Sequence, residues 1–384
     1  INRKNKIMRK LILLPFILLL SSCAVVLNFK DLPTPMGEYL IGTDLFDWED
    51  TFRDEWFTKD KIDTRKIPVQ IWYPASEKSD SLYPYMDYPE IRINAISEAI
   101  EKPKGFVRPA SNVKGNSYYK AKPINKKFPL IVFSHGLGGY KTQNSIAIEA
   151  LVSNGYIVIA PDHTYDANIT IFNDGTTVDY DSELPYGVSA EEFWSVRLPQ
   201  INTRASDISF IIDKLQTMKN SQVYKSIDFN KIGVFGHSFG GATAVVSSWN
   251  DTRISACLNL DGWFVPIVDD IINNGIKIPF CYIGQESWSN EDTLNYDKLD
   301  KFYSNCNSDI YLLKIKGTLH NDFADMPHFS NIGRMITSGK NVDKQFASRL
   351  SFLIVGFFDE YLKDINYNWT EVIVNNYETS IQFK

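Results

Sequence analysis

Short apolar runs alternate with helix-period segments from about residue 129 onward, and this alternation restricts the possible folds more than any other feature of the chain. The runs are 130–133, 157–160, 232–235, 256–260, 280–283 and 310–315. Strands that are apolar on both faces are typical of a parallel sheet covered by helices on both sides. Apolar residues at spacings of three and four predict helices over 201–215 and 346–361. We therefore expect a doubly wound α/β sheet.

The chain before this alternation has a different character. Residues 24 to about 60 are rich in Pro, Asp and aromatic residues without a sustained period, which predicts a tether and an irregular extension over 23–60. A first strand is expected at Val69–Tyr73, followed by a polar excursion over 75–127 with one helix near 93–100. No linker-like composition divides the chain after residue 60, so we expect one catalytic domain over 61–384.

The N-terminus resembles an export signal. Arg9 and Lys10 precede an apolar run, Leu11–Leu20, that is short for a membrane span but has the size of a signal-peptide core. The run ends at Leu20-Ser21-Ser22-Cys23, which resembles a bacterial lipobox. We expect residues 1–22 to be a lipoprotein signal peptide, with Cys23 lipidated and the enzyme held at a membrane in the periplasm or at the cell surface. The alternatives are an ordinary cleaved signal and an uncleaved anchor.

Charge and cysteine content exclude several partners. The net charge of -6 arises from interspersed acids and bases, without the basic stripe that nucleic-acid binding requires. Neither a zinc-type Cys/His spacing nor a phosphate-binding loop is present, so no metal or cofactor is expected. Cys257 and Cys281 lie in strand-like runs and are expected in the core. The sequence does not decide whether Cys306 forms a disulfide.

A nucleophile motif follows the run 232–235. Gly236-His237-Ser238-Phe239-Gly240 leads directly into an apolar helical segment, so the G-x-S-x-G pattern has the strand–turn–helix context of a nucleophile elbow. The glycines allow a strained turn on which a serine is exposed, and the helix N-terminus supplies positive potential. The motif predicts an α/β-hydrolase fold with Ser238 as nucleophile.

A second glycine-rich turn follows the run 130–133, at Ser134-His135-Gly136-Leu137-Gly138-Gly139. In hydrolases of this fold, such a turn contributes one backbone N–H to the oxyanion hole, and the residue after the nucleophile contributes the other. We therefore assign the two donors to Leu137 and Phe239. The carboxyl ends of parallel strands are also where ligands bind in open α/β sheets.

The chain order of this fold places the acid and then the base after the nucleophile. His320 follows the run 310–315 through a short turn, and this placement favours it over His328 as the base. For the acid, Asp261 ends the run 256–260, while Glu286 and Asp292 follow the next strand, and pattern alone leaves the choice open.

Three other histidines, His135, His163 and His237, precede or adjoin the nucleophile. Their place in the chain order is wrong for the base, so we expect them to pack or hydrogen-bond around the site.

With these motifs identified, the chain resembles the plasma-type platelet-activating factor acetylhydrolases, or group VII phospholipases A2, and their bacterial relatives. The likeness runs from about Leu32 to Leu362 and rests on VQIWYPA at 69–75, FSHGLG at 133–138, GHSFGGA at 236–242, LDGW at 260–263 and HNDFAD at 320–325. By position, the resemblance implies Ser238 as nucleophile, Asp261 as acid, His320 as base, and Leu137 and Phe239 as oxyanion donors. The segment 165–199 is this chain's own, and if it covers the site we expect it to influence acyl-chain selection.

The leading hypothesis is a serine ester hydrolase that cleaves short or polar acyl esters, such as the sn-2 acetyl group of phospholipids, through an acyl-enzyme. One alternative is a cutinase-like, polyesterase-like or dienelactone-hydrolase-like enzyme acting on non-lipid esters. Another is a surface-binding lipoprotein without catalysis, which the complete triad and the two oxyanion turns disfavour.

Overall fold

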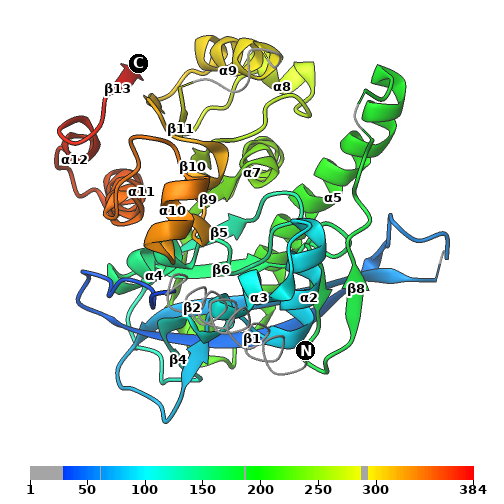
Figure 1. Ribbon diagram of the computed structural model, residues 1–384, viewed down its shortest axis with the longest axis vertical. Helices are drawn as coiled ribbons and strands as arrows, with labels where there is room; N and C mark the ends of the chain where they lie inside the picture. The colour runs from blue at the N-terminus through cyan, green and yellow to red at the C-terminus, as the bar shows by residue number, and fades with distance from the viewer. Residues whose placement is uncertain (1–28, 61, 186, 287–292) are drawn as a thin grey trace, which may run out of the picture.

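A mixed sheet runs through the centre of the computed structural model, which describes residues 29–384 except 61, 186 and 287–292. Its described strands are β1 (Leu40–Asp54), β2 (Thr64–Ala75), β3 (Leu82–Pro84), β4 (Lys114–Tyr119), β5 (Phe128–Ser134), β6 (Ile157–Pro161), β9 (Ile227–His237), β10 (Ile254–Leu260), β11 (Phe280–Gln285), β12 (Ile310–Ile315) and β13 (Thr379–Phe383). Their order across the sheet is β13-β12-β11-β10-β9-β5-β6-β2-β1-β4-β3 (Figure 1).

The centre of this sheet is parallel, as the apolar runs predicted. Every neighbouring pair from β12 to β6 is parallel, and each of the six predicted runs lies inside one of these strands. Within β5, Leu130 and Val132 belong to one buried cluster, while Ile131 and Phe133 belong to another. Successive side chains point to opposite faces, so a strand covered on both sides must be apolar throughout.

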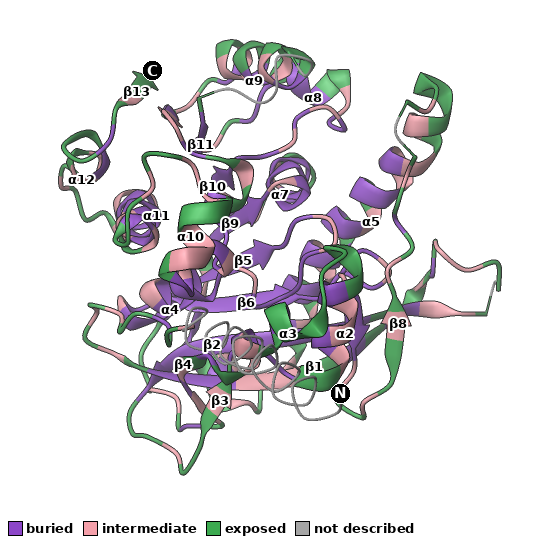
Figure 2. Ribbon diagram, in the orientation of Figure 1, coloured by how far each residue is buried: buried purple, intermediate pink, exposed green. Residues whose placement is uncertain are grey.

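Helices cover both faces of the sheet (Figures 1 and 2). One cluster joins the sheet to residues of α5 (Ala190–Thr217), α7 (Phe239–Asn250), α8 (Asp269–Asn274) and α9 (Thr293–Asn305). The other joins it to α4 (Ser145–Ser153) and α11 (Phe346–Lys363). The predicted doubly wound arrangement is therefore confirmed.

The N-terminal part of the sheet differs from our expectation of an irregular extension up to residue 60. Residues 40–54 form β1, which pairs antiparallel with β2 from Leu40 opposite Ala75 to Asp50 opposite Arg65. The acidic and aromatic residues of β1 alternate between more and less buried positions, so it lacks the continuous apolar run by which the central strands were found. The short strands β3 and β4 extend this edge, and β13 closes the opposite edge.

The segment 165–199 is more regular than its composition indicated. It contains the small hairpin of β7 (Ile169–Ile171) and β8 (Thr177–Asp179) and the first turns of α5. Helix α5 begins at Ala190, where the Ser189 hydroxyl accepts a hydrogen bond from the Glu192 N–H at 3.1 Å, and it continues through Pro199. The predicted helix over 201–215 is therefore only the buried part of a longer helix, whose first turns project from the body of the molecule (Figure 1). The helix expected near 93–100 is α2 (Pro89–Ala99).

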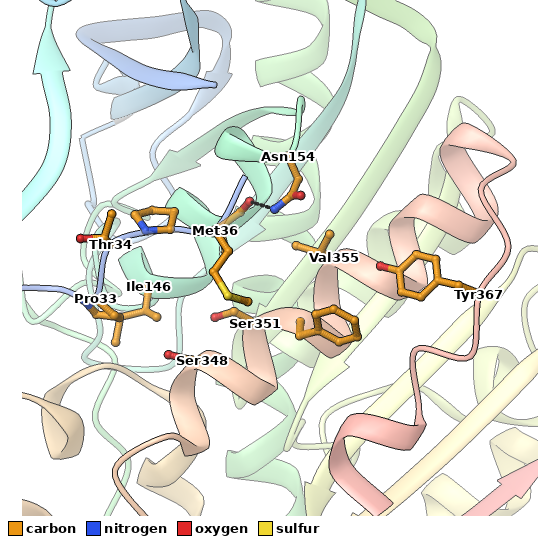
Figure 3. Close-up of a pocket in the computed structure, with 12 residues that line it drawn as sticks. Pro33, Thr34, Met36, Ile146, Asn154, Ser348, Ser351, Val355 and Tyr367 are labelled. Carbon is orange, nitrogen blue, oxygen red and sulfur yellow. Dashed lines mark hydrogen bonds between the residues drawn. The ribbon is translucent and has the colours of Figure 1, made fainter. Parts of the chain in front are cut away.

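Residues 33–36 lie across α4 and α11, which cover the face of the sheet opposite to α5. They border a cavity of about 230 Å³ (Figure 3). Met36, Ile146, Phe352 and Val355 are among the apolar residues that line it. None of the predicted catalytic residues borders this cavity. The cavity thus marks the place where the N-terminal residues 33–36 lie on α4 and α11, before the chain enters β1.

Cys257, Cys281 and Cys306 are buried free thiols. The two predicted core cysteines are therefore in the core. Cys306, whose pairing the sequence left undecided, forms no disulfide among the described residues. The predicted signal peptide 1–22 and Cys23 lie outside the described residues. Within the described part of the chain, no helix combines the length and apolar character needed to cross a membrane.

Candidate active site

The turn between β9 and α7 presents Ser238. Its backbone has φ 58° and ψ -121°, a conformation that non-glycine residues rarely adopt. The turn is tight because glycines flank it: a Cβ on Gly236 would lie 2.2 Å from the Gly240 carbonyl oxygen. The Ser238 N–H donates to the Leu260 carbonyl at 2.9 Å, which ties the turn to β10. Backbone strain of this kind is typical of functional positions, and here it leaves Ser238 half-buried at the carboxyl end of the central strand β9.

The glycine-rich turn after β5 lies directly against this serine. A Cβ on Gly136 would come within 3.3 Å of the Ser238 Cβ, so the two turns are in contact. Gly138 has φ 64° and donates its N–H to the Asp166 carbonyl at 3.0 Å. Among the described residues, the backbone N–H groups of Leu137 and Phe239 have no hydrogen-bond acceptor. Two unpaired N–H groups beside a nucleophile are the arrangement that an oxyanion hole requires.

Asp261 follows β10 and is fully buried, with φ 44°. Its Oδ1 accepts hydrogen bonds from the Tyr282 hydroxyl and the Gln285 N–H, both at 3.0 Å. Its Oδ2 accepts from Gln285 Nε2 at 2.8 Å and from His320 Nδ1 at 2.6 Å. The donors on β11 therefore fix the carboxylate so that one oxygen faces the imidazole ring.

His320 begins a short 3-10 turn, His320–Phe323, after β12, and a third of its side chain is exposed. Because Nδ1 faces the Asp261 carboxylate, Nε2 is the ring nitrogen on the opposite side. The His320 carbonyl accepts a hydrogen bond from His237 Nε2 at 3.0 Å, and the two rings are in tilted contact with centroids 4.6 Å apart. Since His237 immediately precedes Ser238, this contact brings His320 next to the elbow.

His237 is a neutral support in this arrangement. Its Nδ1 faces Gln143 Nε2 at 3.3 Å, and the Gln143 Oε1 accepts from the Gly136 N–H at 2.9 Å. Burial and the neighbouring His320 lower the pKa of His237 to about 3. One chain of hydrogen bonds therefore connects the glycine-rich turn, the elbow and the loop of His320.

The HNDFAD segment anchors that loop. Asp322 Oδ2 accepts from the N–H groups of Leu319 and Gly339 at 2.7 and 2.9 Å. The Phe323 carbonyl accepts from Asn144 Nδ2 at 2.6 Å, and Asp325 accepts from the Ile146 N–H at the start of α4. Asp322, Asp325 and the Phe323 carbonyl thus hold the turn that carries His320.

Two of the three alternative acid and base residues, Glu286 and His328, are among the described residues. Glu286 is exposed at the end of β11, and Asp292 lies outside the described residues. His328 Nε2 donates to the Asp322 carbonyl at 2.8 Å, and the His328 ring stacks on Phe346. The structure brings His320, and not His328, to Asp261.

His135 and His163 lie behind the glycine-rich turn, as expected for supporting residues. His135 is buried and its Nε2 accepts from the His163 N–H at 3.0 Å. His163 faces Ser134 Oγ with Nε2 and Asp207 with Nδ1, at 3.0 and 2.9 Å. Burial and the nearby Arg204 lower the pKa of His163 to about 3.

Sequence reasoning missed the residues that orient this site. Tyr282 and Gln285 hold Asp261, and Gln143 links the two turns, yet no local motif marks any of them. The parallel register that pairs Leu260 with Ile283 could have indicated that residues ending β11 lie beside Asp261. Within the described residues, His, Cys, Asp and Glu side chains form no group of three or more that could hold a metal ion.

The chain is similar in sequence and fold to several known proteins. The family model "Platelet-activating factor acetylhydrolase, isoform II" matches residues 26–381. The chain is 31% identical over 345 residues to the platelet-activating factor acetylhydrolase of Canis lupus familiaris, covering 82% of this chain and 73% of that protein. It is 26% identical over 234 residues to a probable 1-alkyl-2-acetylglycerophosphocholine esterase of Arthroderma benhamiae, covering 59% of this chain and 56% of that protein.

A similar solved structure is a ferulic acid esterase from Streptomyces cinnamoneus, with a TM-score of 0.74 and 22% identity. The match covers 93% of this chain and 99% of the esterase chain. At this identity the likeness shows a shared fold, which agrees with the α/β-hydrolase fold expected from the elbow motif.

Proposed function

Because this chain belongs to the platelet-activating factor acetylhydrolase family, we propose that Ser238, His320 and Asp261 act as the catalytic triad of its ester hydrolysis. The chain is a serine ester hydrolase of the type that this family represents. The observation that carries the triad assignment is the 2.6 Å contact between His320 Nδ1 and the buried Asp261 carboxylate, beside a serine held at a positive φ.

In the proposed reaction, Ser238 Oγ attacks the ester carbonyl carbon while His320 accepts the hydroxyl proton. The Asp261 carboxylate stabilises the resulting imidazolium, and the Leu137 and Phe239 N–H groups donate to the oxygen that becomes negative. The tetrahedral intermediate collapses, and the leaving alkoxide takes the proton from His320, so an alcohol departs and an acyl-serine remains. Water, deprotonated by His320, then attacks the acyl carbon. The second tetrahedral intermediate collapses, Ser238 Oγ takes the proton back from His320, and the carboxylic acid is released.

We propose short or polar acyl esters as substrates, with the sn-2 acetyl group of phospholipids as the leading case. Support comes from the relatives, whose names specify platelet-activating factor and a 1-alkyl-2-acetylglycerophosphocholine. A panel of 2-acetyl and long-chain phosphatidylcholines, together with p-nitrophenyl esters of increasing acyl length, tests this choice. We expect the acetyl esters to be cleaved fastest; a preference for long acyl chains, or cleavage of soluble esters alone, would contradict it.

The nucleophile is tested by Ser238→Ala. We expect hydrolysis to fall by at least about a thousandfold and labelling by a fluorophosphonate probe to disappear, because the variant has no hydroxyl to attack the ester or the probe. Ser195→Ala, at an exposed position of α5, is the control and should behave like the wild type. Labelling that persists in Ser238→Ala would refute the assignment.

Cys23 is the proposed attachment point to a membrane. The support is the sequence Leu20-Ser21-Ser22-Cys23 after the apolar run Leu11–Leu20. Lipidation there would place the enzyme on a lipid surface, where acylated phospholipids are concentrated.

A further inference from the structure

Arg204 lies behind both turns of the candidate active site. It is located on α5, and its side chain is fully buried. Its Nη2 donates to the His135 carbonyl and to Ser134 Oγ, the latter at 3.1 Å. Its guanidinium carbon lies 5.0 Å from the centre of the Phe239 ring, within the range of a cation–π contact. One guanidinium therefore touches the turn that carries Leu137 and the residue that follows Ser238.

The rest of this guanidinium is poorly compensated. Among the described residues, Arg204 Nε and Nη1 have no hydrogen-bond partner, and neither has Asp166 Oδ2, which lies 3.9 Å from Nε. Burial lowers the pKa of Arg204 to about 10 and raises that of Asp166. A buried charge with so few partners is costly for stability, so a gain in fold stability does not explain why Arg204 contacts both turns.

Asp166 holds the same turn from its other end. Its backbone carbonyl accepts from the Gly138 N–H at 3.0 Å, and its Oδ1 accepts from Gln200 Nε2 at 2.5 Å. Gln200 is one helical turn before Arg204, so both contacts originate from α5. The turn is thus fixed at His135 by Arg204 and at Gly138 by Asp166, and Leu137 lies between these two points.

We infer that Arg204 is a positioning residue that sets the distance and direction between the Leu137 and Phe239 N–H groups. It does so by binding the His135 carbonyl on one side and the Phe239 ring on the other. This inference rests on the proposed function, because those two N–H groups are its oxyanion donors. A residue with this role affects the tetrahedral intermediate more than the bound ester.

The test compares Arg204→Gln and Arg204→Lys in the full chain, with p-nitrophenyl acetate as substrate and active sites counted by fluorophosphonate titration. We expect Arg204→Gln to lower kcat about 10- to 100-fold with little change in KM, because a donor that moves slightly loses contact with the developing charge. The inhibition constant of a boronic acid, which binds the serine as a tetrahedral adduct, should rise by the same factor. Lysine retains one donor for His135, so Arg204→Lys should recover part of kcat and of the boronic acid affinity.

Arg65→Gln is the matched control. Arg65 is equally buried on β2, but it binds Glu55, Asp207 and the Thr164 carbonyl, and neither active-site turn. We expect this variant to melt at a lower temperature while its kcat per titrated site stays within about twofold of the wild type, because Asp207 and His163 lie between Arg65 and the glycine-rich turn.

Two results would overturn the inference: an unchanged kcat and boronic acid affinity in Arg204→Gln, or an equal loss of both in Arg65→Gln. If Arg204→Gln does not fold, Arg204→Lys decides by the same two measurements. Failure of the proposed function has a different signature, since Ser238→Ala would then still be labelled. An unlabelled Ser238→Ala with a fully active Arg204→Gln would therefore reject the positioning role alone.

Discussion

At the scale of single residues, the proposed acid is distinguished from its rival by burial. Asp261 is enclosed and faces His320, while Glu286 is exposed after the next strand. We expect Asp261→Asn to lower kcat by about a thousandfold or more, because the amide keeps the shape and removes the charge that stabilises the imidazolium. Glu286→Gln should stay within about twofold of the wild type. Measuring kcat for both variants decides the question, and the opposite ranking would move the acid to β11.

The same residues show what could be predicted from the sequence. The tight turn at Ser238 and the glycine-rich turn at 134–139 were predictable because their glycines are close together in the chain and are required by the backbone geometry. The choice between Asp261 and Glu286 was not predictable from spacing, since it depends on hydrogen bonds between residues distant in sequence. Arg204 also has no motif, because its contacts to Ser134 and His135 arise only when α5 packs behind β5.

At the scale of secondary structure elements, α7 packs closely against the end of β5. A Cβ on Gly240 would lie 1.9 Å from the Ser134 carbonyl oxygen, which is backbone and cannot move aside easily. We expect Gly240→Ala to lower the free energy of unfolding by about 3 kcal/mol and to reduce kcat, because the two turns must separate. Urea denaturation and ester hydrolysis measure the two effects.

Gly105→Ala is the control for this substitution. A Cβ on Gly105, in the exposed helix α3 (Lys104–Val107), would have no neighbour within 4 Å. Its stability should match the wild type or exceed it by up to about 1 kcal/mol, because alanine restricts the unfolded chain. Equal stabilities for the two alanine variants would show that α7 can shift away from β5 at little cost.

Strands that helices cover on both faces were easier to predict than strands with exposed residues. The central strands were predictable because burial on both faces demands continuous apolar runs, as in Leu130–Phe133. By contrast, β1 and β13 were missed because they have acidic or exposed residues along much of their length. The first turns of α5 were missed because Pro199 usually ends a helix, whereas here the helix continues through it.

At the scale of the whole molecule, buried neutral histidines make stability depend on pH. Burial lowers the pKa of both His163 and His237 to about 3, whereas the unfolded value is about 6.5. Above about pH 6.5 both histidines are neutral in the folded and the unfolded protein, so their titration does not change the free energy of unfolding. Below it, the unfolded chain binds more protons, and each histidine lowers the free energy of unfolding by up to about 1.4 kcal/mol per pH unit until the pH nears 3.

Urea denaturation at pH 7, 6 and 5 measures this dependence. We expect the midpoint to fall steadily with pH, and we expect the fall to be shallower in His163→Gln, because one titrating group is removed. A midpoint that does not change between pH 7 and 5 would contradict the neutral state of these histidines.

Membrane attachment also belongs to this scale. Each buried CH₂ of an acyl chain contributes about 0.8 kcal/mol, and stable anchoring needs more than one chain. We expect Cys23→Ser to release the enzyme from membranes or to stall its processing, with the kcat of the folded protein unchanged. Membrane fractionation and the mature mass test this; wild-type behaviour of Cys23→Ser in both would favour an uncleaved anchor.

The attachment of the N-terminal segment has a consequence for the orientation of a tethered enzyme. Phe29 packs against Phe329, with ring centroids 6.2 Å apart, and the Lys30 N–H donates to the Phe329 carbonyl at 2.7 Å. Phe329 lies in the segment that follows His320, so the described N-terminal residues begin beside the loop that carries His320. Five residues separate Cys23 from Phe29, so the six steps along the chain span at most about 20 Å when extended. An acylated Cys23 would therefore hold the region around Phe29 and Phe329 close to the lipid surface. The effective concentration of lipid esters near the candidate active site would rise as a result.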